Sequence, residues 1–463
     1  ISTPYSYAKE MLADGRGLEL PIGRDELDQI WKEVLLYQFH DILPGSSINR
    51  VYVEAKERYE AIVSRLTWGI DKLLNKLIKG RGVANFNSFA YDLPIKVNDL
   101  WYRVRVPALG VTGLSPDKLI EKFEAKATKN SIENDKVRVT FKNGFIVSVY
   151  DKTLGKEFVR KGAKFNRFTL YKDFGNCWDI RRNYRIWKRN ATCDSFETGT
   201  DGAKAYALVR YSVGNTEIKQ EISILDGSPL VSFDTDIDTD SKNSMLRVAF
   251  PVNIETDECK FNIQFGHIAR KTTENNSIEK AQFEVPGQKF VDMSDNECGI
   301  SVINNCKYGF RCKHGVIDMN VSRSPLLGPG KDVDFGHHHF RYAIFPHKGA
   351  LSYQTYRKAY LFNNPLSVIT NGVKEAEEIQ NYFTDNKSII LEAVKLADDG
   401  NGMIVRAYNC SDMPQTAAIS IRGFKPVCFT DILENSIGDA PKGMFEFGSF
   451  ELKCIRFTKE ENV

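Results

Sequence analysis

Apolar positions in the first eighty residues recur every three or four places. Such spacing predicts amphipathic helices. The first stripe leads up to a stop at Pro44-Gly45, and it is formed by Leu27, Ile30, Trp31 and Val34. A longer stripe runs from Ile48 to Leu77. Ser46 or Ser47, just before it, is placed to cap the start of this second helix. Because the link is short, we expect antiparallel packing and predict a helical bundle domain over residues 1–82.

After residue 83 apolar and polar residues alternate along the chain, which predicts β-strands. The stretch VRVTFKNGFIVSVYDK turns at Asn143-Gly144, a strong hairpin signal, and Asp226-Gly227 repeats the pattern. Short strands continue almost to the end, and only residues 351–362 are ambiguous between helix and strand. The predicted fold class is therefore mainly β with an amino-terminal helical bundle, with the β part built as antiparallel sandwiches.

Three β units are predicted. Residues 83–124 form a small β segment that pairs with the carboxy-terminal β domain, and residues 125–365 form a large β-sandwich. A polar stretch near residue 370 precedes a carboxy-terminal sandwich over residues 366–463.

Composition excludes several classes of partner. A net charge of +3 over 463 residues gives no reason to expect a nucleic acid, and no apolar run reaches the length of a membrane span. Nine cysteines without a CxxC pair indicate a reducing compartment, so we predict a cytoplasmic protein. The opening ISTPYSYAKEML resembles the interior of a domain, which predicts a fragment.

The stretch LLYQFHDILPGSSI places Gln38, His40 and Asp41 in an apolar helix end that we expect to be buried. Buried polar groups need hydrogen-bond partners or a metal. Adjacent helical side chains diverge by roughly 100 degrees, so His40 and Asp41 should not share an ion pair but could both reach one object above the helix end. Spacing alone favours the alternative, a structural hydrogen-bond network.

Other candidate residues have structural alternatives. Cys306, Cys312 and His314 lack the paired spacing of a structural zinc site. In GHHHF, His337 and His339 should share one strand face with His338 opposite, which favours hydrogen-bonding roles over metal binding. The Arg323 fork suits sugar hydroxyls, with a structural ion pair as the default.

WKEVLLYQFHDILPGSSINRVYVEA, residues 31 to 55, resembles the histidine–aspartate segment of glycoside hydrolase family 38, the retaining α-mannosidases. Further similar motifs follow in order to about residue 360, among them AQFEVPGQKFVDMSD, SRSPLL and DFGHHHFRYAIFPHKG. The resemblance implies a galactose-mutarotase-like large sandwich. It also implies that His40 is a ligand of one Zn²⁺ ion and that Asp41 contacts mannose hydroxyls. Gln38 is a candidate partner for the second ring nitrogen.

The sequence departs from this family in what it lacks. It contains no H-x-D motif, so the other zinc ligands, the nucleophile and the acid/base are expected from an upstream catalytic domain, and no catalytic residue is predicted in this chain. The loop GNCWDIRRNY resembles a tryptophan–aspartate segment but is shorter, which weakens a substrate role for Trp178 and Asp179.

The predicted function is a zinc-dependent retaining α-mannosidase that hydrolyses terminal α-linked mannose from oligosaccharides or glycans and forms dimers or tetramers. The chain alone is expected to be inactive. Three alternatives stay open: a hydrolase of a small mannosylated solute, a non-catalytic carbohydrate-binding sandwich protein, and an architectural half that supports oligomerisation.

Overall fold

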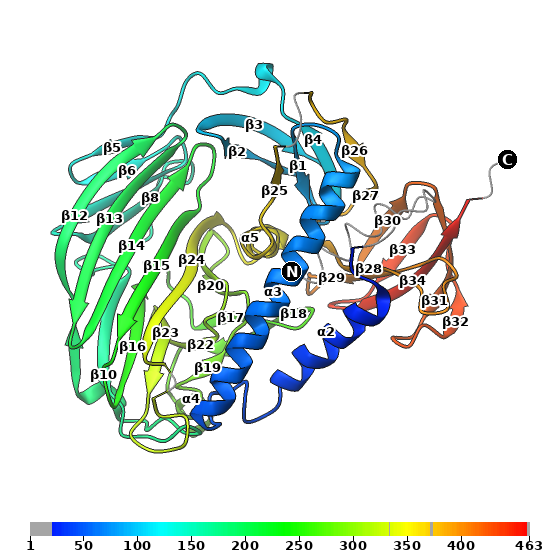
Figure 1. The fold of residues 1–463 in the computed structure, drawn as a ribbon. Coiled ribbons are helices and arrows are strands. Elements are labelled where there is room, and N and C mark those ends of the chain that lie inside the picture. The colour runs from blue at the N-terminus through cyan, green and yellow to red at the C-terminus, as the bar shows by residue number, and fades with distance from the viewer. Residues whose placement is uncertain (1–20, 333, 371–373, 461–463) are drawn as a thin grey trace.

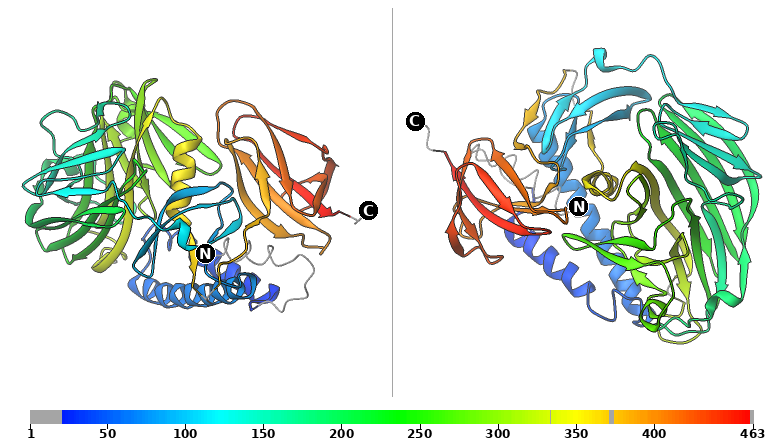
Figure 2. Two further views of the ribbon diagram at one scale, coloured as in Figure 1. Left: turned by 90° about the horizontal axis from the view of Figure 1, so that it is seen from above. Right: turned by 180° about the vertical axis from the view of Figure 1, so that it is seen from behind.

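The computed structural model describes residues 21–332, 334–370 and 374–460. A large β-sandwich lies at one end and a smaller sandwich at the other. A small β unit and one helix lie between them, and two long helices run along one side of the assembly (Figures 1 and 2). The predicted fold class, mainly β with antiparallel sandwiches, is confirmed. In the described ranges, no helix is long and apolar enough to cross a bilayer.

Helices α2 (Arg24–Tyr37) and α3 (Asn49–Leu77) form the described part of the predicted bundle; residues 1–20 of that prediction lie outside the described residues. Ion pairs between Glu26 and Arg65 and between Glu33 and Arg58 hold the two helices antiparallel. The inner face of α3 joins a hydrophobic cluster with the small β unit and the carboxy-terminal sandwich. The helices are therefore stabilised by packing against β structure as well as against each other.

The large sandwich consists of three sheets around one core. In strand order, the longest sheet contains β12 (Thr192–Asp201), β13 (Lys204–Val213), β14 (Thr216–Leu225), β15 (Val231–Thr239), β24 (Gly336–Lys348), β21 (Cys298–Asn304), β20 (Phe290–Ser294), β17 (Glu258–Ile263) and β18 (Gly266–Lys271). The second contains β11 (Lys188–Asn190), β10 (Arg167–Lys172), β16 (Ser244–Pro251), β23 (Val316–Ser324), β22 (Gly309–Lys313) and β19 (Val285–Pro286). The third contains β5 (Lys126–Thr128), β6 (Ser131–Glu133), β7 (Val137–Lys142), β8 (Phe145–Asp151) and β9 (Lys156–Glu157). Short helices η2 (Tyr184–Ile186) and α4 (Ser277–Ala281) lie in its connections.

The two hairpin signals had different outcomes. Strands β7 and β8 pair around Asn143 and Gly144, whose φ angles of 51° and 73° are those of the predicted tight turn. Around Asp226-Gly227, by contrast, Ile224 pairs with Val231. The connection from β14 to β15 is therefore longer than a two-residue turn.

The small β unit is assembled from two separate parts of the chain. Strand β1 (Gly82–Asn85) lies between β4 (Gly110–Gly113) and β25 (Ser367–Ile369), and β26 (Ile379–Gln380) pairs with β4. Strands β2 (Tyr91–Val97) and β3 (Leu100–Val106) form a separate hairpin, and η1 (Pro116–Lys118) follows. The ambiguous segment 351–362 is helical, as α5 (Tyr353–Asn363), with Ser352 as its side-chain N-cap.

The carboxy-terminal sandwich contains, in strand order, β27 (Tyr382–Thr384), β30 (Gln415–Ile421), β31 (Phe424–Thr430), β34 (Leu452–Lys459), β29 (Met403–Asn409) and β28 (Ile389–Leu396), with β32 (Ser436–Asp439) on β31 and β33 (Met444–Phe447) on β30. His267 of the large sandwich lies at its border. The ring nitrogen Nδ1 is 2.9 Å from the Tyr356 hydroxyl of α5, and the ring packs edge-on against Phe450. Burial lowers the pKa of His267 to about 4.

Candidate functional site

The QFHD segment lies in a turn rather than in a helix. Helix α2 ends at Tyr37, and the backbone N–H of Gln38 donates to the Leu35 carbonyl at 3.2 Å. The chain then turns repeatedly as far as Gly45, whose φ of +82° is easily adopted only by glycine. The predicted continuation of the helix to Pro44 is therefore wrong, because the helix stops a full two turns before the Pro-Gly signal.

The backbone carbonyl of Asp41 organises this turn. It accepts hydrogen bonds from the Ser46 N–H at 3.2 Å, the Ser47 hydroxyl at 2.8 Å and the Tyr52 hydroxyl at 3.1 Å. The Ser46 hydroxyl also donates to the Asp41 carboxylate at 3.2 Å. Neither serine caps α3, whose N-cap residue is Ile48, because both hydroxyls are used to hold the turn.

His40 and Asp41 face solvent side by side. Their side chains are 75% and 51% exposed, and His40 Nε2 lies 3.3 Å from Asp41 Oδ2. Two predictions are wrong here: the side chains are not buried, and they do contact each other. The predicted separation fails because α2 ends at Tyr37, and a divergence of about 100 degrees applies only to consecutive residues of a helix.

The apolar residues that suggested burial are also exposed. We define the apolar band as the large side chains along the outer face of α2 and the following turn: Trp31, Leu35, Leu36, Phe39 and Leu43, which are 44–72% exposed. Contiguous exposed apolar surface of this kind marks an interaction site. The helix end has the composition of buried structure, and nothing in the described residues covers it.

Within the described residues the zinc ligand set is incomplete. No group of three or more His, Cys, Asp or Glu side chains there is arranged to hold a metal ion. A protein zinc site uses at least three ligands, and the turn supplies His40 with Asp41 beside it. The described residues therefore do not fit a zinc site by themselves.

Arg323, at the end of β23, is held on several sides. Its Nε donates to the fully buried Asp173 carboxylate at 2.6 Å, and its Nη2 donates at 2.8 Å to the carbonyls of both Asn176 and Asp179. These contacts include a structural ion pair, which was the default role expected for Arg323 from the sequence. Contact between Arg323 and a substrate stays a prediction.

A path of direct contacts links this arginine to the turn. The Cys177 N–H donates to the Leu327 carbonyl at 3.1 Å, which joins the loop of Trp178 to the loop that follows β23. Further along that loop, Gly330 lies so close to Gly45 that a Cβ on Gly330 would be 2.1 Å from the Gly45 carbonyl oxygen. The turn that carries His40 and Asp41 is thus connected, through the loop that follows β23, to the loop of Trp178, whose side chain is 64% exposed.

Sequence reasoning missed two residues of this region. Asp173 is buried and distant in sequence from Arg323, and Gly330 is equally distant in sequence from Gly45. A buried carboxylate needs a partner, but the sequence does not say which of many arginines supplies it.

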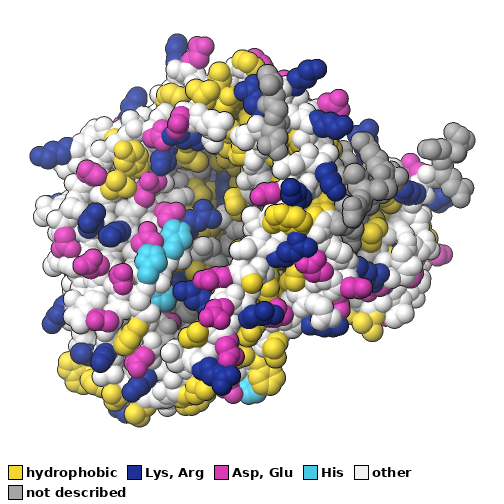
Figure 3. All heavy atoms as spheres, viewed as in Figure 1, with side chains coloured by type: hydrophobic (Ala, Val, Ile, Leu, Met, Phe, Trp, Pro, Cys, Tyr) yellow, Lys and Arg dark blue, Asp and Glu magenta, His cyan; other side chains and the backbone are white. Residues whose placement is uncertain are grey.

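The histidines of β24 alternate as predicted. His337 Nε2 and His339 Nδ1 lie 3.3 and 3.2 Å from Asp236 Oδ1 on one face of the sheet. His338 Nε2 instead lies 2.9 Å from the Asp334 carbonyl, and Asp334 in turn accepts the backbone N–H of Arg323. Figure 3 shows histidine side chains on the rim of the hollowed centre of the molecule.

The Cys306, Cys312 and His314 group does not converge. Cys312 is buried and Cys306 is exposed, while His314 Nε2 lies 2.9 Å from the Glu274 carboxylate.

Comparisons with known proteins agree over three separate regions. Residues 5–77 match the alpha mannosidase middle domain, residues 132–329 the glycosyl hydrolases family 38 C-terminal domain, and residues 388–455 the glycosyl hydrolases family 38 C-terminal beta sandwich domain.

An alpha-mannosidase of Saccharomyces cerevisiae is 30% identical over 82% of the chain and 36% of that protein. Alpha-mannosidase 2C1 of Homo sapiens is 27% identical over 86% of the chain and 41% of that protein. A putative mannosylglycerate hydrolase of Halalkalibacterium halodurans is 22% identical over 66% of the chain and 39% of that protein. The chain thus spans about two-fifths of the length of these relatives.

The fold is similar to that of a solved structure. The crystal structure of an alpha-mannosidase from Enterococcus faecalis V583 superposes with a TM-score of 0.82 at 16% identity, covering 98% of this chain and 65% of the other. Given the three family domains in order, the chain belongs to glycosyl hydrolases family 38 and carries that family's middle and carboxy-terminal domains.

Proposed function

We propose that this chain forms the middle and carboxy-terminal part of a zinc-dependent, retaining α-mannosidase that releases terminal α-linked mannose from oligosaccharides or glycans. The observation that carries the proposal is the exposed His40–Asp41 pair, presented on a hydrogen-bonded turn at the edge of the apolar band. A histidine and a carboxylate held there are available to a ligand and to a second polypeptide surface at once.

His40 is the proposed contributor of one ligand to a single Zn²⁺ ion, with the remaining ligands coming from a catalytic domain. Asp41 is proposed to accept hydroxyl groups of the mannose. Its Oδ1 is already fixed by Ser46, so Oδ2 has a defined direction. The nucleophile and the acid/base of the retaining reaction are expected from that catalytic domain too, and the described residues by themselves are expected to be inactive.

The apolar band is the proposed surface for that catalytic domain, since burying it removes several large side chains from water. All nine cysteines are free, which supports the proposed cytoplasmic compartment. We also propose that the complete protein forms a homo-oligomer. The similarity to a putative mannosylglycerate hydrolase favours one second candidate, a small mannosylated solute as substrate.

The test uses the enzyme assembled with its catalytic domain. His40→Ala should lower both zinc content, measured by elemental analysis, and turnover of an aryl α-mannoside by roughly 10- to 100-fold or more. His339→Ala, an exposed histidine of β24, is the matched control and should change neither. Unchanged zinc content in His40→Ala would refute the ligand role.

Asp41→Asn separates the sugar contact from the metal. Asparagine keeps an acceptor for Ser46, so the turn and the zinc content should persist while turnover falls. Turnover at the parent rate would show that the carboxylate does not contact the sugar.

A further inference from the structure

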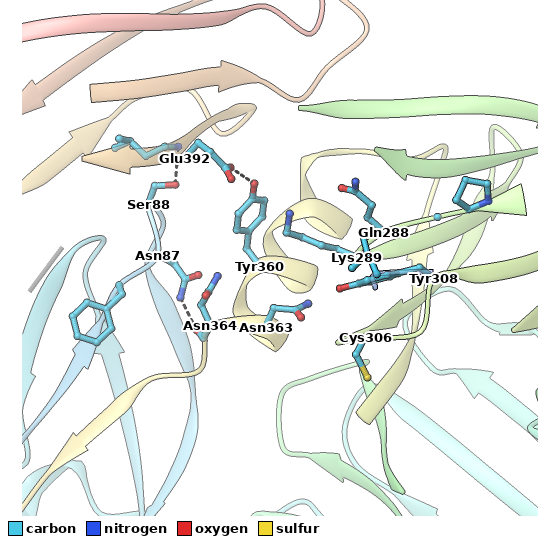
Figure 4. A pocket seen from close by; sticks show the side chains of 15 residues that line it. Asn87, Ser88, Gln288, Lys289, Cys306, Tyr308, Tyr360, Asn363, Asn364 and Glu392 are labelled. Carbon is cyan, nitrogen blue, oxygen red and sulfur yellow. Dashed lines mark hydrogen bonds between the residues drawn. The ribbon is translucent and has the colours of Figure 1, made fainter. Parts of the chain in front are cut away.

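A cavity of about 690 Å³ lies where four parts of the fold meet. Its walls come from the small β unit, α5, the start of the carboxy-terminal sandwich and the large sandwich (Figure 4). Leu43 of the QFHD turn also lines it. That volume is within the range of about 300–1,000 Å³ typical of small-molecule sites. Residues distant in the sequence thus enclose a space large enough for a ligand of one or two rings.

One buried polar group in the wall lacks a partner. Asn87 is only 4% exposed, and its Nδ2 donates to the Asn364 carbonyl and to Asn85 Oδ1, each at 3.0 Å. Its Oδ1 accepts no hydrogen bond from any described residue. A buried amide oxygen without a donor is unfavourable. This oxygen has almost no accessible surface, so a ligand hydroxyl in the cavity would supply the donor once the Asn87 amide turns toward it.

A charged group on the opposite wall is also available. The Lys289 ammonium lies 4.8 Å from the centre of the Tyr360 ring and forms no ion pair within the described ranges. The Tyr360 hydroxyl donates to the Glu392 carboxylate. Figure 4 shows Lys289 and Tyr308 reaching from the large sandwich toward Tyr360, with Asn87 beyond α5 on the other side.

The balance of these groups identifies the ligand class. Lys289 and Glu392 contribute one charge of each sign, and Gln288 adds an amide that both donates and accepts. Asn363 adds an acceptor oxygen, because its Nδ2 already donates to the carbonyls of Asn304 and Ala359. An anion would face the Glu392 carboxylate, and a hydrocarbon would leave the Asn87 oxygen unpaired. Hydroxyl groups donate and accept at once, and the half-exposed Tyr308 ring offers an apolar face for a sugar ring.

We infer that this cavity is a binding site for a neutral saccharide of one or two rings. The inference depends on the lining residues and does not require that the chain be a mannosidase. It adds a carbohydrate contact formed entirely by residues of this chain.

The experiment is a calorimetric titration of the 463-residue chain with α-1,2-mannobiose and with maltose, and separately with inorganic phosphate. One of the two disaccharides should bind with a dissociation constant below roughly 10 mM. Tyr308→Ala and Gln288→Ala should each weaken that binding by roughly five- to tenfold. Phe383→Ala is the matched control, because Phe383 is 51% exposed, like Tyr308 at 52%, but does not line the cavity.

Each other outcome overturns the inference. Failure of both disaccharides to bind, binding of phosphate alone, or equal affinity in all three variants would do so. Gln288→Ala decides the matter if Tyr308→Ala does not fold. Among the described residues Gln288 pairs with Asn262 and Asn304 through its backbone, which the substitution leaves in place. Loss of binding in His40→Ala alone would place the sugar at the turn, which contradicts the cavity site and leaves the proposed function standing.

Discussion

The Arg323–Asp173 pair should hold the loop of Trp178 in place, and a double-mutant cycle can measure this. The two changes remove groups with different surroundings. Arg323→Ala leaves the Asp173 carboxylate fully buried, with the Gly175 N–H at 2.8 Å as its remaining partner. Leaving one charge of a buried pair uncompensated costs about 3–5 kcal/mol.

The reverse change should cost less. Asp173→Ala leaves the guanidinium 16% exposed and still bonded to the carbonyls of Asn176 and Asp179. The loss is then one charge-assisted hydrogen bond, about 1.5–3 kcal/mol. Because the double variant also removes the buried carboxylate, it should cost no more than Arg323→Ala alone, and the coupling energy should be at least about 2 kcal/mol.

Hydrogen exchange followed by mass spectrometry is the suitable assay, because a chain with several units need not unfold in one step. Peptides over residues 173–183 and 324–332 should lose protection in each variant, whereas β29 in the carboxy-terminal sandwich should not. A coupling energy under about 0.5 kcal/mol, or equal costs for the two single variants, would refute the account of this pair.

Three further changes test other parts of the fold. Gly330→Ala should displace the QFHD turn and raise its hydrogen exchange by roughly tenfold or more, since overpacking costs about 1–3 kcal/mol; Gly443→Ala, with nothing within 4 Å of its added Cβ, should change nothing. Because the pKa of His267 is lowered from 6.5 to about 4, the unfolded chain takes up the proton first as the pH falls, so stability is full above pH 6.5 and is lost towards pH 4. Relative to His267→Gln, denaturation should show a loss of about 2 kcal/mol at about pH 5, and an NMR titration giving His267 a pKa above 6 would contradict this. Leu36→Gln, at a side chain 61% exposed, should leave the melting temperature unchanged and weaken docking of the catalytic domain in sedimentation experiments; equal docking would remove Leu36 from the interface.

Local signals predicted much of the fold. The Asn143-Gly144 hairpin follows from backbone conformations that few residues adopt, and the structure has the expected positive φ angles there. The helical stripe of α3 also corresponds to a real inner face. In both cases the information lies within a few consecutive residues.

The site was harder to predict because its features depend on distant or missing surfaces. The sequence pattern of an apolar helix end predicts burial whether the surface that covers it belongs to this chain or to another. The exposure of Leu35 and Phe39 could therefore not be predicted from that pattern. The early end of α2 was missed since Pro44-Gly45 gave a stronger stop signal than Tyr37. The contact of Gly330 with Gly45 joins segments whose sequences carry no mutual signal.

Asp41 separates architecture from chemistry within a single residue. Its main-chain carbonyl accepts hydrogen bonds from Ser46, Ser47 and Tyr52 that set the shape of the turn, while one oxygen of its side chain stays open to solvent beside His40. Replacing the side chain should therefore alter what the edge recognises without erasing the loop that presents it. A scaffold of this kind allows selection to explore new ligands at position 41 while the backbone conformation is inherited unchanged.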